Sequence, residues 1–435
     1  MRGGVKFPPL FAQSRNNHRF RLVHLKGPPM STAAVTPTPP QAAPPGLTLV
    51  SAAPVAKAKS AVLMEVVVNR DAFLAEVAAA QGITSSRTTI PILSNLLIEA
   101  QDGFLKISAS NIEQTLTTKA PATVKKAGVA TVPARKLYDY LKLLPAGDIS
   151  IKLLDNDWIR IQAARSNTKM VGMARDSYPA IPTIGSLPKV TLPTTTLRSL
   201  IAHTISAVSM EESRYTLTAS LLLLEPTKVS MVSTDGTRLA LAEKDEALEG
   251  VTAPRKLLVP YQALHNLASL LASTKSETVE IAESDTTLFV VIGEREYTSR
   301  KKAGAFPNYA AVMPRSNNNV VILRTVDVER SVRRVAQFTD QRSSGVKLAL
   351  GANALKISAS TTESGESEDT IDCPYASEQI LIKLNSDFIL DFCKVVGSLG
   401  EVRLSFKDGR SAAVLEPEAA NRDIRFTLVL MPMRF

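Results

Sequence analysis

The residues that could do chemistry in this chain are few and scattered. The histidines and cysteines, the usual ligands of zinc, form no cluster: His18, His24, His203, His265, Cys373 and Cys393. Structural zinc sites need pairs of such residues at short spacing, and disulfide frameworks need larger cysteine sets. The sequence therefore predicts no metal site and no cofactor site, and the two distant cysteines fit a reducing compartment.

One carboxylate stands in a motif that could serve an enzyme. Asp235 lies in Thr234-Asp235-Gly236, directly after a predicted strand. The same tripeptide is typical of a tight turn, which we favour as its role. The sequence has neither a glycine-rich phosphate loop nor a nucleophile elbow. We predict no catalytic residues and keep an enzyme that uses Asp235 as an alternative.

The chain repeats one long pattern three times. Residues 105–110 and 355–360 both read Leu-Lys-Ile-Ser-Ala-Ser, 250 residues apart, and residues 229–234 near the midpoint have the same pattern. Each copy alternates apolar and polar residues, as a half-buried strand does. A strand that leads into an amphipathic helix occurs upstream and downstream of every copy. Each unit is predicted to be an α+β domain of two helices and about eight strands.

These repeats predict four segments in the chain. They are a Pro-rich basic extension over 1–63 and three domains over 64–188, 189–316 and 317–435. The extension holds ten prolines, eight basic residues and no acidic residue, which predicts disorder. Its composition also resembles an organelle transit peptide. We favour an extended or mis-assigned start of the gene.

The net charge of +10 belongs largely to that extension, because 43 basic and 41 acidic residues remain after its removal. Bulk charge therefore does not identify a nucleic-acid binder. No apolar run approaches the roughly 20 residues of a transmembrane helix.

The predicted helices carry apolar stripes, with basic residues on the opposite face. In the third unit Val328 and Val332 point inward, while Arg330 and Arg333 point outward. The last stripe is expected to run as far as Leu399. Such basic faces are usually solvated, but on one shared surface they could contact phosphates without reading sequence.

The C-terminus is unusually rich in apolar residues and methionine, as Leu428-Val429-Leu430-Met431-Pro432-Met433-Arg434-Phe435 shows. We expect a closing strand whose last residues border a groove, since methionine suits surfaces that meet several partners.

Five stretches in this order resemble the bacterial DNA sliding clamp family, the beta subunits of the replicative DNA polymerase. They are Thr89-Ile90-Pro91-Ile92-Leu93-Ser94-Asn95-Leu96-Leu97, Thr131-Val132-Pro133-Ala134-Arg135-Lys136, Thr234-Asp235-Gly236-Thr237-Arg238-Leu239-Ala240, Phe306-Pro307-Asn308-Tyr309 and Met431-Pro432-Met433-Arg434-Phe435. They are spread over residues 64–435.

The resemblance implies a DNA polymerase processivity factor of the DNA-clamp fold. Two chains would join head to tail into a six-domain ring that encircles and slides on double-stranded DNA without reading its sequence. The implied partners are the replicative DNA polymerase catalytic subunit, the clamp loader and other proteins with a clamp-binding motif, in the bacterial cytoplasm at the nucleoid and not at a membrane. A repeat-built peptide-binding adaptor that forms no ring is the alternative.

The resemblance also implies three sets of functional residues. A partner-peptide groove between the second and third domains would be formed by Leu217, Thr234, Gly236, Arg238, Leu239, Pro307, Val312, Asn385, Phe388, Val429, Leu430, Met431, Pro432 and Met433. The DNA-facing residues would be Arg87, Arg135, Lys136, Lys142, Arg198, Arg330, Arg333 and Arg334. The dimer interface would hold Arg165, Thr168, Lys169, Phe338, Glu366 and Glu368. Thr237 and Thr168 depart from the family's usual residues.

Overall fold

The computed structural model describes residues 61–84, 89–340, 342–397, 399–418 and 423–435. Nearly all of the predicted extension, and Arg87, lie outside these residues. The described residues belong to one compact unit, Lys59–Phe435. Its first strand begins at Val62, two residues before the expected start of the first domain.

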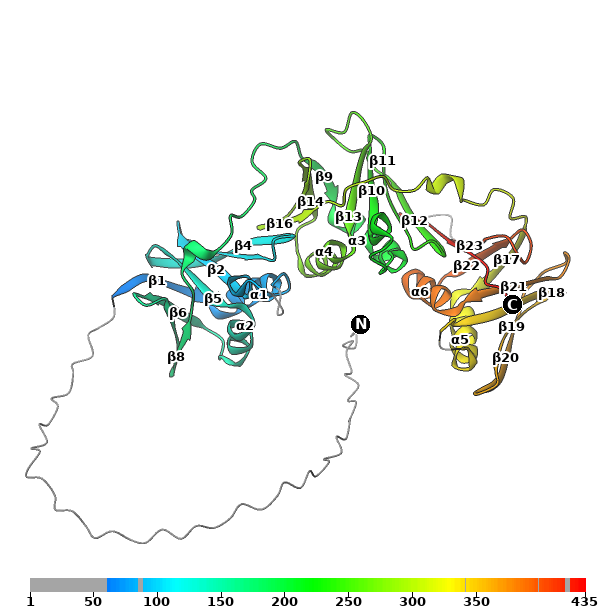
Figure 1. Ribbon diagram of the computed structural model, residues 1–435, viewed down its shortest axis with the longest axis horizontal. Coiled ribbons are helices and arrows are strands. Elements are labelled where there is room, and N and C mark those ends of the chain that lie inside the picture. The colour runs from blue at the N-terminus through cyan, green and yellow to red at the C-terminus, as the bar shows by residue number, and fades with distance from the viewer. Residues whose placement is uncertain (1–60, 85–88, 341, 398, 419–422) are drawn as a thin grey trace, which may run out of the picture. The chain divides into compact units, whose positions relative to one another are not determined.

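The described residues form three repeats, shown in chain order from blue to red in Figure 1. The first repeat contains β1 (Val62–Asn69), α1 (Arg70–Gln81), β2 (Asn95–Gln101), β3 (Phe104–Ser110), β4 (Gln114–Lys126), β5 (Gly128–Pro133), α2 (Ala134–Leu143), β6 (Asp148–Leu154), β7 (Trp158–Ala163) and β8 (Ser166–Val171). Two short 3-10 helices, η1 (Pro91–Ser94) and η2 (Arg175–Ser177), complete it.

The second repeat has the same element order. It contains β9 (Val190–Pro193), α3 (Thr194–Thr204), β10 (Ala219–Glu225), β11 (Lys228–Thr234), β12 (Arg238–Asp245), β13 (Arg255–Pro260), α4 (Tyr261–Ser273), β14 (Thr278–Glu283), β15 (Thr287–Ile292) and β16 (Arg295–Arg300). Its 3-10 helices are η3 (Ile205–Ala207) and η4 (Tyr215–Thr218), and η5 (Tyr309–Ala311) follows it.

The third repeat completes the described chain. It contains β17 (Asn319–Arg324), α5 (Thr325–Val335), η6 (Ala336–Phe338), β18 (Gly345–Gly351), β19 (Ala354–Thr361), β20 (Gly365–Asp372), β21 (Ile380–Asn385), α6 (Ser386–Val396), β22 (Glu401–Phe406), β23 (Ala413–Glu418) and β24 (Arg425–Leu430). In the described residues each repeat thus holds two α-helices and eight strands, which confirms the predicted α+β domains.

Helix boundaries follow from local residue chemistry. The Asn385 side chain accepts hydrogen bonds from the backbone N–H groups of Asp387 and Phe388, and so caps the start of α6. The helix ends at Val396 because Gly397 has φ 84°, a conformation that glycine adopts without strain. The predicted apolar stripe is therefore wrong at Leu399, which lies beyond the helix and is 103% exposed.

Sheets connect neighbouring repeats. Strand β4 pairs with β16 of the second repeat, which places both in one 12-stranded sheet. Strand β12 likewise pairs with β24, so an 8-stranded sheet joins the second and third repeats. The remaining sheet has the order β20-β19-β18-β21. This arrangement leaves β8 and β20 at free sheet edges.

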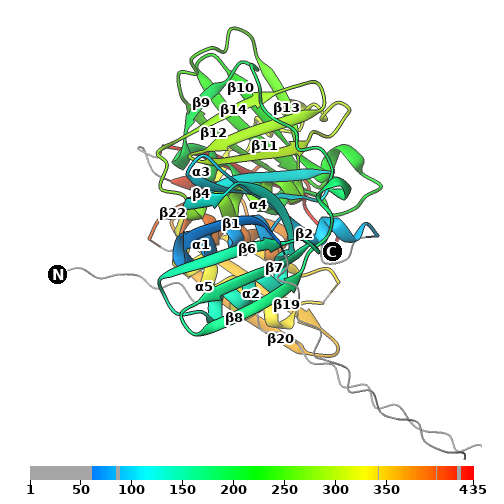
Figure 2. The same ribbon diagram turned by 90° about the vertical axis from the view of Figure 1, so that its left-hand side faces the viewer.

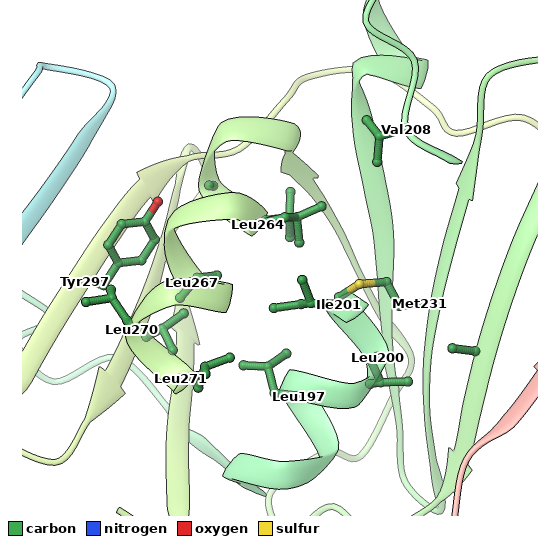
Figure 3. Packing of buried hydrophobic residues seen from close by; sticks show 14 of the residues in the cluster. Leu197, Leu200, Ile201, Val208, Met231, Leu264, Leu267, Leu270, Leu271 and Tyr297 are labelled. Atoms are coloured by element: carbon green, nitrogen blue, oxygen red, sulfur yellow. The ribbon is translucent and has the colours of Figure 1, made fainter. Parts of the chain in front are cut away.

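The helices pack their apolar stripes onto the sheets. In the second repeat, Leu197 and Ile201 of α3 point toward Leu264 and Leu271 of α4, and all four are buried (Figure 3). Burial of a leucine or isoleucine side chain contributes about 1.5–3 kcal/mol. No helix in the described part of the chain is long and apolar enough to cross a bilayer.

Candidate functional site

The pairing of β12 with β24 brings the C-terminal segment beside the turn between β11 and β12. Arg238 pairs with Leu430, and the Met431 backbone N–H donates to the Thr237 carbonyl at 2.9 Å. This is the same junction in which the sequence predicted a groove.

Asp235 shapes that turn. Its Oδ1 atom accepts hydrogen bonds from the backbone N–H groups of Thr237, at 2.9 Å, and Arg238, at 3.0 Å. Gly236 has φ 87°, and a Cβ atom there would lie 2.7 Å from Nη1 of Arg214. The turn therefore requires glycine, and Asp235 uses its carboxylate to hold the backbone.

A cavity of about 170 Å³ opens at this turn. Most of the predicted groove residues line it: Leu217, Thr234, Gly236, Arg238, Leu239, Pro307, Val312, Val429 and Met431. Asn308 and Tyr309 also line it, although the prediction of the groove omitted them. Their place directly after Pro307 was the available sequence signal.

The cavity is apolar because strands β12 and β24 beneath it contribute buried apolar side chains. Leu239 of β12 and Val429 of β24 belong to one apolar cluster, against which Phe306 and Tyr309 pack. Burial raises the pKa of the Tyr309 phenol above its usual value. Such a cavity suits the apolar side chains of a peptide anchored between a few polar groups.

The remaining predicted groove residues do not line this cavity. Asn385 caps α6, and Leu430 is buried in the sheet. The Phe388 ring lies beneath Arg238, with 3.9 Å between the guanidinium carbon and the ring centre. Pro432 and Met433 line a second cavity of about 560 Å³, together with Leu381, Asp408, Gly409, Arg410, Arg434 and Phe435.

The described members of the predicted DNA-facing set are exposed on helices α2, α3 and α5: Arg135, Lys136, Lys142, Arg198, Arg330, Arg333 and Arg334. Three of them also pair with carboxylates. Arg135 bonds to Asp139 at 2.9 Å, Arg333 to Glu329 at 2.5 Å, and Arg334 to Asp369 of β20. These pairs reduce the local positive charge, and Arg334 points toward a sheet edge.

The predicted interface residues lie at the two free sheet edges. Thr168 and Lys169 are on β8, which lies beyond β7 at the edge of the first repeat (Figure 2), and Arg165 directly precedes β8. Glu366 and Glu368 are on β20. Phe338 ends η6, which contacts β20, and its side chain is half-buried.

Within the described residues, no group of three histidine, cysteine, aspartate or glutamate side chains could hold a metal ion. Cys373 and Cys393 are buried free thiols, and burial raises the pKa of Cys393 to about 12.

The three domain models of the DNA polymerase III beta subunit match this chain. The N-terminal domain matches residues 64–182, the central domain residues 191–308 and the C-terminal domain residues 310–434.

Curated relatives and solved structures agree with these matches. The beta sliding clamp of Caulobacter vibrioides is 31% identical over 379 residues, which cover 85% of this chain and 100% of the relative. The structures of the DnaN sliding clamps of Pseudomonas aeruginosa and Bartonella birtlesii, both bound to griselimycin, superpose with TM-scores of 0.79 and 0.80. Each is 29% identical and covers 86% of this chain and 100% of its own. The chain therefore belongs to the DNA polymerase III beta subunit family, the beta sliding clamps.

Proposed function

We propose that three parts of the molecule carry out the functions of a sliding clamp. The strand edges form the dimer, the basic helix faces contact DNA and the apolar cavity binds partners. As a member of this family, the chain is a DNA polymerase processivity factor that binds DNA, forms homodimers and interacts with the polymerase and the clamp loader. The family is not catalytic, and we propose that this chain has no enzymatic activity either.

We infer the dimer interface from the strand pairing between repeats. The fifth element of each repeat pairs with the last strand of the next repeat, as β4 does with β16 and β12 with β24. In the third repeat the equivalent strand, β20, pairs only with β19 among the described residues and so presents a free edge. In the first repeat, β8 pairs there only with β7 and presents a free edge as well. Two copies joined head to tail would pair β20 of one with β8 of the other, and the ring would close.

The register of the proposed β20–β8 contact can be derived from the β4–β16 pairing, because β20 is equivalent to β4 and β8 to β16. Thr117 of β4 pairs with Glu296 of β16. The equivalent residues are Glu368 of β20 and Asn167 of β8, which would therefore lie opposite each other. Lys169 would then lie opposite Glu366. Arg165 would lie between Glu368 and Asp372 on the neighbouring strand. Opposite charges across a strand pair stabilise it and select the register.

We assign DNA binding to the exposed basic residues of the helices. Arg135, Lys136, Lys142, Arg198, Arg330 and Arg333 lie on α2, α3 and α5. A few weak contacts to phosphates do not depend on base sequence, which suits a ring that slides. Arg334 bonds to Asp369 of β20, so we assign it to the dimer edge instead.

We assign partner binding to the apolar cavity beside Arg238. The observation that carries this assignment is the convergence of three distant stretches, at Thr234, Pro307 and Met431, on one apolar cavity. The second cavity, with Pro432 and Met433, extends the surface available to a peptide. We also propose that the protein works in the cytoplasm at the nucleoid.

Two measurements test these assignments. Light scattering should give a mass near twice that of the 46.8 kDa chain. A stable monomer at micromolar concentration would contradict the ring. Griselimycin should bind the protein and lose affinity in Leu239→Ala, whose side chain lines the cavity. Equal affinity in wild type and variant would remove the cavity from the binding site.

A further inference from the structure

One arginine connects the cavity to the next repeat. Arg238 lines the cavity, yet its side chain is only 11% exposed. Its Nε donates to Asp235 at 3.1 Å, and Nη2 donates to the Ser206 carbonyl, both in the second repeat. Its Nη1 donates to Asp391 of the third repeat at 2.9 Å. Arg238 therefore bridges the junction that contains the cavity.

Asp391 takes part in this bridge without lining the cavity. It lies on α6, and its side chain is 42% exposed. Phe388 lies one turn earlier on the same helix and places its ring against the Arg238 guanidinium. Helix α6 thus fixes the guanidinium by a charged hydrogen bond and by a cation–π contact.

The repeats contain an equivalent bridge at the other junction. Gln114 is the first residue of β4, as Arg238 is of β12, and Asn266 is the sixth residue of α4, as Asp391 is of α6. The Asn266 amide donates to Gln114 Oε1 at 2.6 Å. Both side chains are buried, at 5% and 8% exposed. The fold therefore builds this bridge twice, once as a buried neutral pair and once as a charged pair at the cavity.

We propose that Asp391 is a positioning residue of the partner groove, acting through Arg238. This inference rests on the proposed function of the cavity. Asp391 holds the guanidinium at the cavity wall, so its loss lets Arg238 turn toward its other two partners or into the cavity. A bound ligand that meets Arg238 in its bridged position binds more tightly when the bridge is intact, and by linkage the ligand stabilises the bridge. At the first junction the equivalent pair is neutral, with the Asn266 amide bonded to the Gln114 amide.

The test measures griselimycin affinity of the dimer by calorimetry. Asp391→Asn should weaken binding about three- to tenfold. This loss lies between the contribution of an exposed ion pair and that of a buried charged hydrogen bond. Asp391→Glu keeps the charge and should recover at least half of the loss. Asp387→Asn is the matched control, because it removes the same charge from the first turn of α6 and leaves the Arg238 bridge in place. Thermal melts of each variant confirm folding.

A double-mutant cycle identifies the route of the effect. In an Arg238→Gln background, Asp391→Asn should cause no further loss of affinity. If it weakens binding there by the same factor, Asp391 does not act through Arg238 and the inference is overturned. Equal affinity of Asp391→Asn and Asp387→Asn would overturn it as well. A wild-type protein that does not bind griselimycin would instead refute the cavity assignment, and the inference with it.

Discussion

Reversal of the charge at Lys169 should open the ring. In the transposed register, Lys169 of β8 lies opposite Glu366 of β20 in the partner copy. Lys169→Glu replaces an attraction with a repulsion between carboxylates. An opposite-charge pair across strands contributes about 0.2–1 kcal/mol, and like charges cost a similar amount. The change is therefore about 0.4–2 kcal/mol per interface.

The ring multiplies this effect because a head-to-tail dimer has two identical interfaces. Dissociation breaks both, so the free energy of dimerisation should fall by about 0.8–4 kcal/mol. Since 1.4 kcal/mol corresponds to a factor of ten, the dissociation constant should rise about 4- to 700-fold. The wild-type interface should also weaken as salt rises, because ions screen the edge charges.

Sedimentation equilibrium over a range of concentrations measures this constant. Lys347→Glu is the control, because Lys347 is exposed on β18, which is paired on both sides by β19 and β21. The combined Lys169→Glu and Glu366→Lys variant should restore the dimer. If Lys169→Glu dissociates no more than the control, Lys169 lies outside the interface. If the combined variant stays dissociated, the register is wrong.

Four further predictions concern the other parts of the molecule. Deletion of Met431–Phe435 should abolish griselimycin binding and leave the dimer mass unchanged; a loss of the dimer would mean that the segment is structural. Arg135→Glu should lower the salt slope of DNA binding by about 0.9 if this residue contacts one phosphate, and an unchanged slope would exclude it. Glu76→Gln should destabilise the fold by about 3 kcal/mol in denaturant titrations, because Arg295, bonded to Glu76 at 2.9 and 3.0 Å, would keep a buried charge without a counterion; a loss below 1 kcal/mol would contradict this. The Cys393 thiol, with a pKa of about 12, should react with iodoacetamide at pH 8 only on unfolding, and rapid labelling of the folded dimer would show that it is accessible.

The sequence predicted the repeat and its elements because those depend on local periodicity. The identical phrases at 105–110 and 355–360 became β3 and β19, and the inward residues Val328 and Val332 are buried in α5. The stripe to Leu399 failed because apolar periodicity continued past Gly397, whose positive φ ends the helix. A single glycine therefore ended α6 before the apolar pattern ended.

The contacts between repeats could not be predicted in the same way. Strand pairing across a junction is non-local, so nothing near Arg238 indicates that β12 pairs with β24. The bond from Arg238 to Asp391 joins residues 153 positions apart. For the cavity, the sequence supplied most of the lining residues through the family resemblance. The sequence did not predict that Tyr309 lines the cavity or that Asp391 bonds to Arg238.

The most direct test of the ring is retention on DNA of different topology. The protein, loaded by the clamp loader, should remain on nicked circular DNA through gel filtration and leave once the circle is cut to a linear form. A ring encircles the duplex and can only slide off an end. Equal retention on circular and linear DNA would show binding by surface contacts alone and would contradict the proposed topological link.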